Sequence, residues 1–176
     1  VNILGEAGLA AYSIINYITT NIYMVLLGLT FGAQPLMSYN YGAKLKERMH
    51  QILKVSGLVI AAILGAGTLL FFIVPNVLLS LFNASSGMLE IGETGLRILS
   101  LSFIVSSFGV LMSGVFEALG LGKYSLIVSL LRQLLITVPL AYILLNIMGI
   151  EGIWLSFVIA EAIASIVAYI LYHKKF

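Results

Sequence analysis

The sequence contains no cysteine, which excludes disulfides, cysteine metal sites and thiol nucleophiles. Charged residues are also scarce: they make up 9% of the 176 residues, whereas a soluble domain carries about 25%. A chain that is 61% hydrophobic with so few charges cannot cover a globule with polar surface. The composition therefore predicts an integral membrane protein or a piece of one.

Motifs for enzymatic chemistry are also missing from the sequence. It has no phosphate-binding loop, no GxGxxG, no Ser/His/Asp set and no metal-ligand spacing. Its two histidines, His50 and His173, lie at the predicted edges of spans. We expect a protein that is not an enzyme and that uses no cofactor, no metal site and no nucleic-acid partner. ATP hydrolysis by this segment is excluded, so energy must come from an ion gradient or from another subunit.

Long apolar runs dominate what remains, and a bilayer core needs about 20 apolar residues per helix. No period-two alternation of the kind found in membrane barrels occurs. The fold class is therefore all-α, a polytopic transmembrane bundle. Five spans are predicted, at about residues 8–33, 51–74, 95–118, 124–148 and 152–172.

The distribution of basic residues predicts the orientation of these spans. Seven of the nine lie on one side: Lys44, Lys46, Arg48, Lys54, Lys123, Lys174 and Lys175. The positive-inside rule makes this side cytoplasmic. The C-terminus is then cytoplasmic and Val1 external. The first span begins almost at once, without an export signal, so we expect further helices upstream.

Small residues recur every four positions on several spans. Examples are Gly57, Ala61 and Gly65 on the second span, and Ser156, Ala160, Ala164 and Ala168 on the fifth. Such stripes let membrane helices approach closely. They predict tight packing, although a sliding seam between helices would use the same residues.

Two ionisable residues, Arg132 and Glu161, lie inside spans. Counted along the helices, Arg132 is roughly 13 Å and Glu161 roughly 18 Å from the cytoplasmic face. A charge at the membrane centre costs about 2.5 kcal/mol or more, so each needs a partner or water. We predict an ion pair or water-bridged contact between them. It would be either a static clasp or a protonatable Glu161 controlled by Arg132.

The first span carries a polar stripe, which is unusual in a lipid environment. Tyr12, Asn16, Thr19, Thr20 and Tyr23 share one helical face. The stripe predicts either hydrogen bonds between helices or the lining of an aqueous or ligand cavity. It continues towards Gln34, while adaptable apolar walls would come from Met24, Phe31, Phe108 and Met112.

A polar junction, residues 32–44 (GAQPLMSYNYGAK), follows the first span. We predict that the span ends at Gln34 and Pro35 and that a cytoplasmic hinge begins there. Pro35, Asn40 and Gly42 are the candidate hinge residues, with Gly42 allowing the turn.

This junction resembles the multidrug and toxic compound extrusion (MATE) family, in its bacterial multidrug-export and DNA-damage-inducible branch. The resemblance covers essentially the whole chain. It rests on residues 28–36 (GLTFGAQPL), 38–44 (SYNYGAK), 117–123 (EALGLGK), 131–140 (LRQLLITVPL), 148–154 (MGIEGIW) and 160–161 (AE).

The resemblance implies a twelve-helix transporter of two lobes, in which this chain supplies helices eight to twelve. Such proteins lie in the bacterial plasma membrane, open alternately to its two sides, and export cationic amphipathic drugs in exchange for Na⁺ or H⁺. The expected partners are the bilayer, small organic cations and the N-terminal half of the same transporter. Gln34 and the polar face of the first span would border the cavity of the second lobe.

The chain departs from the family pattern at one point. Some members carry an acidic residue in the middle of the tenth helix, but residues 102–114 contain none. The coupling-ion site is therefore expected in the N-terminal lobe. Two other readings stay open: a lipid-linked oligosaccharide flippase of related fold, and a structural membrane fragment that does not transport. The flippase reading predicts a cavity richer in Arg and Lys than this one, where only Arg132 lies within the membrane.

Overall fold

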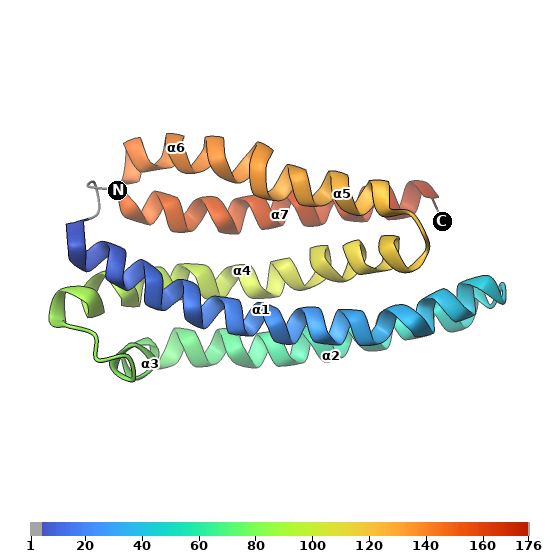
Figure 1. Cartoon of the computed structure of the whole chain (residues 1–176), viewed down its shortest axis with the longest axis horizontal. Helices are drawn as coiled ribbons and strands as arrows, with labels where there is room; N and C mark the ends of the chain where they lie inside the picture. The colour runs from blue at the N-terminus through green and yellow to red at the C-terminus, as the bar shows by residue number, and fades with distance from the viewer. Residues whose placement is uncertain (1–4, 176) are drawn as a thin grey trace.

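The protein is a bundle of helices, seen in a computed structural model that describes residues 5–175 (Figure 1). No strand occurs among these residues, and five helical segments are long and apolar enough to cross a membrane. The predicted all-α class with five spans is confirmed. The elements are α1 (Gly5–Gly42), α2 (Lys46–Ile73), α3 (Pro75–Ser80), α4 (Ser86–Ala118), α5 (Gly122–Leu130), the π-helical η1 (Leu131–Ile136), α6 (Thr137–Met148) and α7 (Ile150–Lys175).

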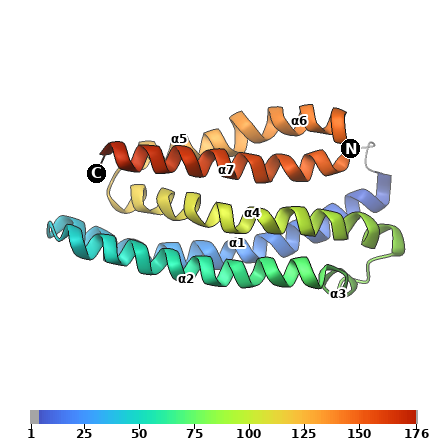
Figure 2. The ribbon, with the colours of Figure 1, turned by 180° about the vertical axis from the view of Figure 1, so that it is seen from behind.

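The α4 helix lies at the centre of the bundle. Figures 1 and 2 show it between the α1–α2 pair and the layer formed by α5, α6 and α7. In its most apolar stretch 67% of the residues are buried, against 11% for the Gly122–Met148 span. Most of the bundle therefore packs on α4, while the α5–η1–α6 arm keeps most of its surface open.

Hydroxyl groups from three helices donate hydrogen bonds to backbone carbonyls of α4. Thr68 of α2 donates to the Ser100 carbonyl at 2.9 Å, and Ser165 of α7 donates to the Val105 carbonyl at 2.9 Å. Ser38 of α1 donates to the carbonyl of Ala118, the last residue of α4, at 2.7 Å. Hydrogen bonds of this kind join membrane helices where lipid supplies no hydrophobic drive for association.

Small residues bring the backbones close enough for these bonds. Gly114 of α4 faces Thr30 of α1, and an added methyl group there would collide with the Thr30 methyl. Gly152 of α7 similarly lies against the backbone of Leu144 in α6. The stripe predicted on the fifth span is confirmed as a packing surface, since all four of its members are buried: Ser156, Ala160, Ala164 and Ala168.

The stripe predicted on the second span is a packing surface only at Gly57, which lies against α4. Ala61 is exposed, and no atom lies within 4 Å of a methyl group added at Gly65. The α2 helix instead buries larger residues one position away, among them Ile60, Leu64 and Phe71. Spacing alone identified the period of this helix but not which face meets α4.

The predicted end of the first span at Gln34 and Pro35 is wrong, because α1 continues to Gly42. The candidate hinge residues Pro35, Asn40 and Gly42 all lie inside this helix. The turn falls at residues 43–45, where Lys44 adopts the left-handed conformation with φ 59°. A proline is tolerated inside a membrane helix when neighbouring groups satisfy the freed backbone.

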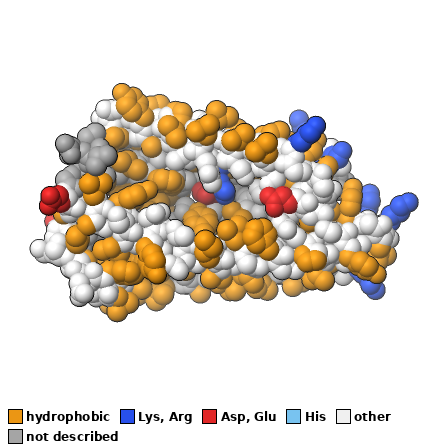
Figure 3. All heavy atoms as spheres, in the orientation of Figure 1, with side chains coloured by type: hydrophobic (Ala, Val, Ile, Leu, Met, Phe, Trp, Pro, Cys, Tyr) orange, Lys and Arg blue, Asp and Glu red, His pale blue; other side chains and the backbone are white. Residues whose placement is uncertain are grey.

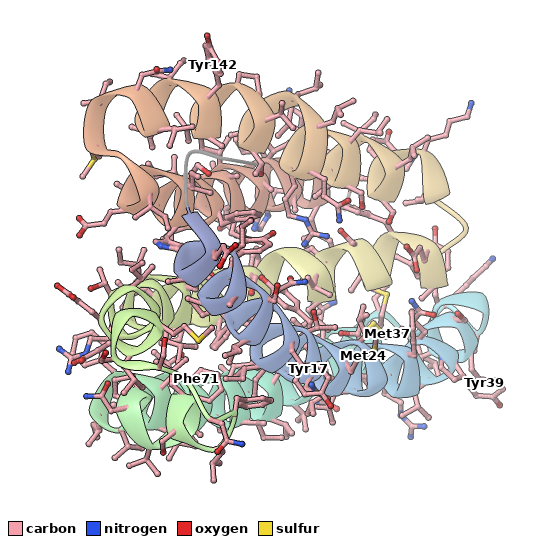
Figure 4. The ribbon with its side chains drawn as sticks, turned by 60° about the vertical axis from the view of Figure 1, so that its left-hand side comes forward. Tyr17, Met24, Met37, Tyr39, Phe71 and Tyr142 are labelled. Carbon is pink, nitrogen blue, oxygen red and sulfur yellow. The ribbon has the colours of Figure 1, made fainter. Side chains whose placement is uncertain are left out.

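Charged and aromatic side chains are distributed unevenly over the surface. Basic side chains gather at one end, where the α1–α2 turn, the α4–α5 turn and the end of α7 meet (Figures 1 and 3). Figure 4 shows Tyr142 and Tyr39 pointing away from the bundle, and both are exposed, whereas Met37 and Phe71 are buried. The outer surface is thus apolar and aromatic, as expected for a surface in contact with lipid.

We predict that Gly114→Ala destabilises the full-length transporter by about 1–3 kcal/mol, because buried Thr30 cannot move away from the added methyl group. Gly65→Ala is the matched control, since its added methyl group meets open space. The measurement is the melting temperature of the purified transporter in detergent. Equal melting temperatures for the two variants would contradict the packing described for α1 and α4.

Candidate functional site

The polar face of α1 lines an open cavity of about 130 Å³. Three helices contribute to it: α1 provides one wall, and α4 and α7 complete it with Phe103, Trp154 and others. Tyr12 stacks on Trp154, with ring centroids 5.5 Å apart and planes at 20°. The lining thus includes the predicted residues Tyr12, Asn16, Thr19, Thr20 and Tyr23.

A second cavity, of about 650 Å³, lies beside the first and shares Thr20, Tyr23 and Phe157 with it. Its opposite wall is the α5–η1–α6 arm, and Glu161 of α7 contributes to its lining. We call the two adjoining cavities the charged groove. Figure 3 shows a hollow near the middle of the molecule in which acidic and basic atoms lie side by side. The remaining lining residues of the second cavity are Met24, Leu27, Val110, Arg132, Gln133, Thr137 and Val138.

The arm that carries Arg132 is not a regular α-helix, because η1 widens it into a π-helical turn. Pro139, at the third position of α6, has no N–H to bond the carbonyl four residues before it and would clash with that carbonyl. Both the N–H and the hydroxyl of Thr137 bond instead to the Arg132 carbonyl, the hydroxyl at 2.6 Å. Turns of this kind occur frequently at functional sites.

Arg132 and Glu161 meet in the charged groove. The Arg132 Nη1 atom lies 3.5 Å from the Glu161 Oε2 atom, and the side chains are 19% and 11% exposed. The other carboxylate oxygen, Oε1, accepts a hydrogen bond of 3.1 Å from the Tyr23 hydroxyl. The structure thus brings together the two ionisable residues whose depths match in the sequence. It adds Tyr23, so the carboxylate connects α1, η1 and α7.

A second polar cluster lies nearer the basic end of the bundle, and the sequence did not reveal it. Gln34 Nε2 donates to Glu117 Oε2 at 3.1 Å, and Ser125 Oγ donates to Glu117 Oε1 at 2.7 Å. Glu117 therefore connects α1 to the start of α5. The available signal was Gln34, which continues the polar stripe of α1 towards this end.

Three of the four predicted wall residues do not line the charged groove. Phe31 is exposed and is not among the lining residues. Met112 is 2% exposed and lies in the hydrophobic core. Phe108 packs on Tyr169 of α7, with ring centroids 6.0 Å apart. The apolar walls come from Met24, as predicted, and from Leu27 and Phe157. Gln34 is not among the lining residues of the groove and contacts Glu117. The sequence also missed Trp154, Gln133 and Thr137, since it could not show which side of each helix faces α1.

The fold and site can now be compared with known proteins. The sequence model of the MatE family matches residues 1–143. The chain belongs to the MATE transporter family. It is 26% identical over 167 residues to the multidrug export protein MepA of Staphylococcus saprophyticus, a match that covers 95% of this chain and 37% of that protein. MepA of Staphylococcus aureus strain N315 is 25% identical over the same length and coverage.

Solved structures of MATE transporters share this fold. A MOP superfamily transporter from Pyrococcus furiosus superposes with a TM-score of 0.90 at 24% identity, covering 97% of this chain and 39% of that one. An outward-facing multidrug resistance MATE transporter gives 0.89 at 23% identity, with the same coverages. The chain is thus a multi-pass membrane segment of a MATE transporter and spans about 37% of the length of its curated relatives.

We predict that water enters the charged groove and that a cysteine placed there reacts quickly with a charged thiosulfonate. Gln133→Cys points into the groove, whereas its neighbour Leu134 is 59% exposed but outside the groove lining. Gln133→Cys should react roughly tenfold faster than Leu134→Cys, because the reactive thiolate needs water. The segment has no native cysteine to interfere. Equal rates in the full-length transporter, made free of cysteine elsewhere, would contradict a hydrated groove.

Proposed function

We propose that the whole transporter is a secondary active antiporter that exports cationic amphipathic drugs in exchange for Na⁺ or H⁺. In this proposal the chain supplies part of its second lobe. The observation that carries the proposal is the position of Glu161, a carboxylate at the base of a groove with aromatic and apolar walls. Such a site suits an organic cation, because the carboxylate attracts its charge while the rings and methionine contact its apolar body.

The charge of the groove bears on the alternative of a lipid-linked oligosaccharide flippase. Among the described lining residues, Arg132 is the only basic one, and Glu161 balances it. A carrier of a lipid pyrophosphate needs an excess of positive charge to bind its substrate. The balance therefore favours a cationic or neutral substrate over an anionic one.

The coupling ion belongs to the proposal as well. Glu161 could bind it, as could an acidic residue of the N-terminal lobe that lies outside this chain. Residues 102–114 of α4 contain no carboxylate. Among the described residues that line the groove, Glu161 is therefore the acidic one. Transport rather than catalysis is proposed, because the relatives that the chain matches include multidrug export proteins.

The proposed transport is tested by ethidium efflux from cells that express the full-length transporter. Glu161→Gln should reduce the efflux rate roughly tenfold or more, since it removes the charge that attracts the cation. Glu151→Gln is the matched control, because Glu151 lies on the same helix in an exposed position. Wild-type transporter that gives no efflux above a vector control, for ethidium or a panel of other organic cations, would refute the proposed function.

We also propose that the basic end of the bundle is cytoplasmic, as the positive-inside rule indicates. Cysteines substituted for Lys46 and Ser86 mark opposite ends of the bundle, because α2 begins at Lys46 and α4 begins at Ser86. In intact cells an impermeant maleimide should label Ser86→Cys but not Lys46→Cys, and permeabilised cells should show both. Labelling of Lys46→Cys alone in intact cells would reverse the orientation.

A further inference from the structure

We propose that Arg132 is an internal cation that competes with the transported cation for the Glu161 carboxylate. The inference rests on the proposed function and adds to it the residue that discharges the site. In the empty transporter the guanidinium neutralises Glu161. When a substrate cation enters the charged groove, it takes the place of Arg132, which swings into the open cavity. When the substrate leaves, Arg132 returns.

The first observation is how loosely the guanidinium is held. Arginine carries five N–H donors, and strong arginine–carboxylate pairs are bidentate at about 2.7–2.9 Å. Here the guanidinium makes one contact, at 3.5 Å, and has no other partner among residues 5–175. A buried pair stabilises a fold only when its geometry is good enough to offset the cost of desolvation. This geometry suits an exchangeable pair better than a structural clasp.

The second observation is that Glu161 is held independently of Arg132. Tyr23 donates to Oε1 from α1, whereas Arg132 contacts Oε2 from the other side of the charged groove. The Tyr23 ring is itself packed edge-on against Phe103 of α4, with centroids 6.2 Å apart. The carboxylate therefore stays in place when Arg132 departs, and its Oε2 atom becomes available to another cation.

The third observation is the space beside Arg132. Its side chain lines the cavity of about 650 Å³, along with the uncharged polar residues Gln133 and Thr137. The backbone of the π-helical turn is tied by Thr137, so the side chain can move without unwinding the arm. A displaced guanidinium thus has both room and polar surroundings.

The charges around the carboxylate make the exchange mutually exclusive. The groups that face Glu161 are Tyr23 from α1 and Arg132 from η1, and no other charged side chain is among the described lining residues of the groove. A bare carboxylate at this depth is costly, and two cations on it would repel each other. Either Arg132 or the ligand therefore neutralises Glu161, and removing Arg132 should tighten ligand binding while slowing release.

The test uses two probes of the same shape and opposite charge, tetraphenylphosphonium and tetraphenylborate, with the purified full-length transporter. Arg132→Gln should lower the Kd for tetraphenylphosphonium roughly tenfold, the size expected from loss of one close competing charge. Its efflux assay should show a lower KM together with a lower kcat. Arg97→Gln is the matched control, because Arg97 is 45% exposed and pairs with Glu93 on α4, outside the groove lining.

The reverse variant keeps the test decisive if Arg132→Gln does not fold. In Glu161→Gln the guanidinium has no competitor, so tetraphenylphosphonium binding should weaken and tetraphenylborate binding should become at least several-fold tighter than in wild type. Unchanged tetraphenylborate binding would show that Arg132 does not face the ligand, and would overturn the inference.

The outcomes separate the inference from the proposed function. Wild type that binds tetraphenylphosphonium, with Arg132→Gln binding it equally or more weakly, overturns the competition but leaves cation transport standing. Wild type that binds neither tetraphenylphosphonium nor any cation that it exports refutes the proposed function itself. Tighter binding in Arg132→Gln with unchanged binding in Arg97→Gln supports the competition.

Discussion

The α4 helix can hold the other spans together only because their backbones come very close to it. In lipid, apolar side chains gain nothing by leaving the solvent, so packing contacts and hydrogen bonds between helices must supply the association. Gly114 makes room for Thr30, and hydroxyl groups from α1, α2 and α7 donate hydrogen bonds to backbone carbonyls of α4. Each bond is worth about 1 kcal/mol, so the bundle depends on many of them being made together.

This central packing also creates the charged groove. The α1 helix lies on one side of α4 and the α5–η1–α6 arm on the other, with α7 between them (Figure 1). Because α1 packs on α4 and the α5–η1–α6 arm packs on α7, rather than the two walls packing on each other, a cavity remains between them that reaches Glu161. Tyr23 and Arg132 meet across it through that carboxylate. A charge pair deep in the bundle is therefore a consequence of the architecture as well as of the two residues.

The loose geometry of this pair has a physical origin in Pro139. Without a donor at that position the arm widens into a π-helical turn, and Arg132 is the second residue of this turn. A regular helix would carry Arg132 at a different angle to α7. The π-helical turn thus positions the Arg132 guanidinium and leaves it with a single contact to Glu161. Strong arginine–carboxylate pairs are typically bidentate, so this geometry is that of an exchangeable pair.

The sequence by itself determined the membrane class, the five spans and the matching depth of Arg132 and Glu161, because hydrophobic length and rise per residue are properties of each helix alone. Only the tertiary structure decided which face each helix presents. It placed Ala61 at the surface, Met112 in the core and Glu117 against Gln34. It also showed that α1 continues past Pro35 and that the turn lies at Lys44. The reason is that the rotation of a helix in lipid depends on which neighbours fit against it, and that fit is a property of pairs of helices.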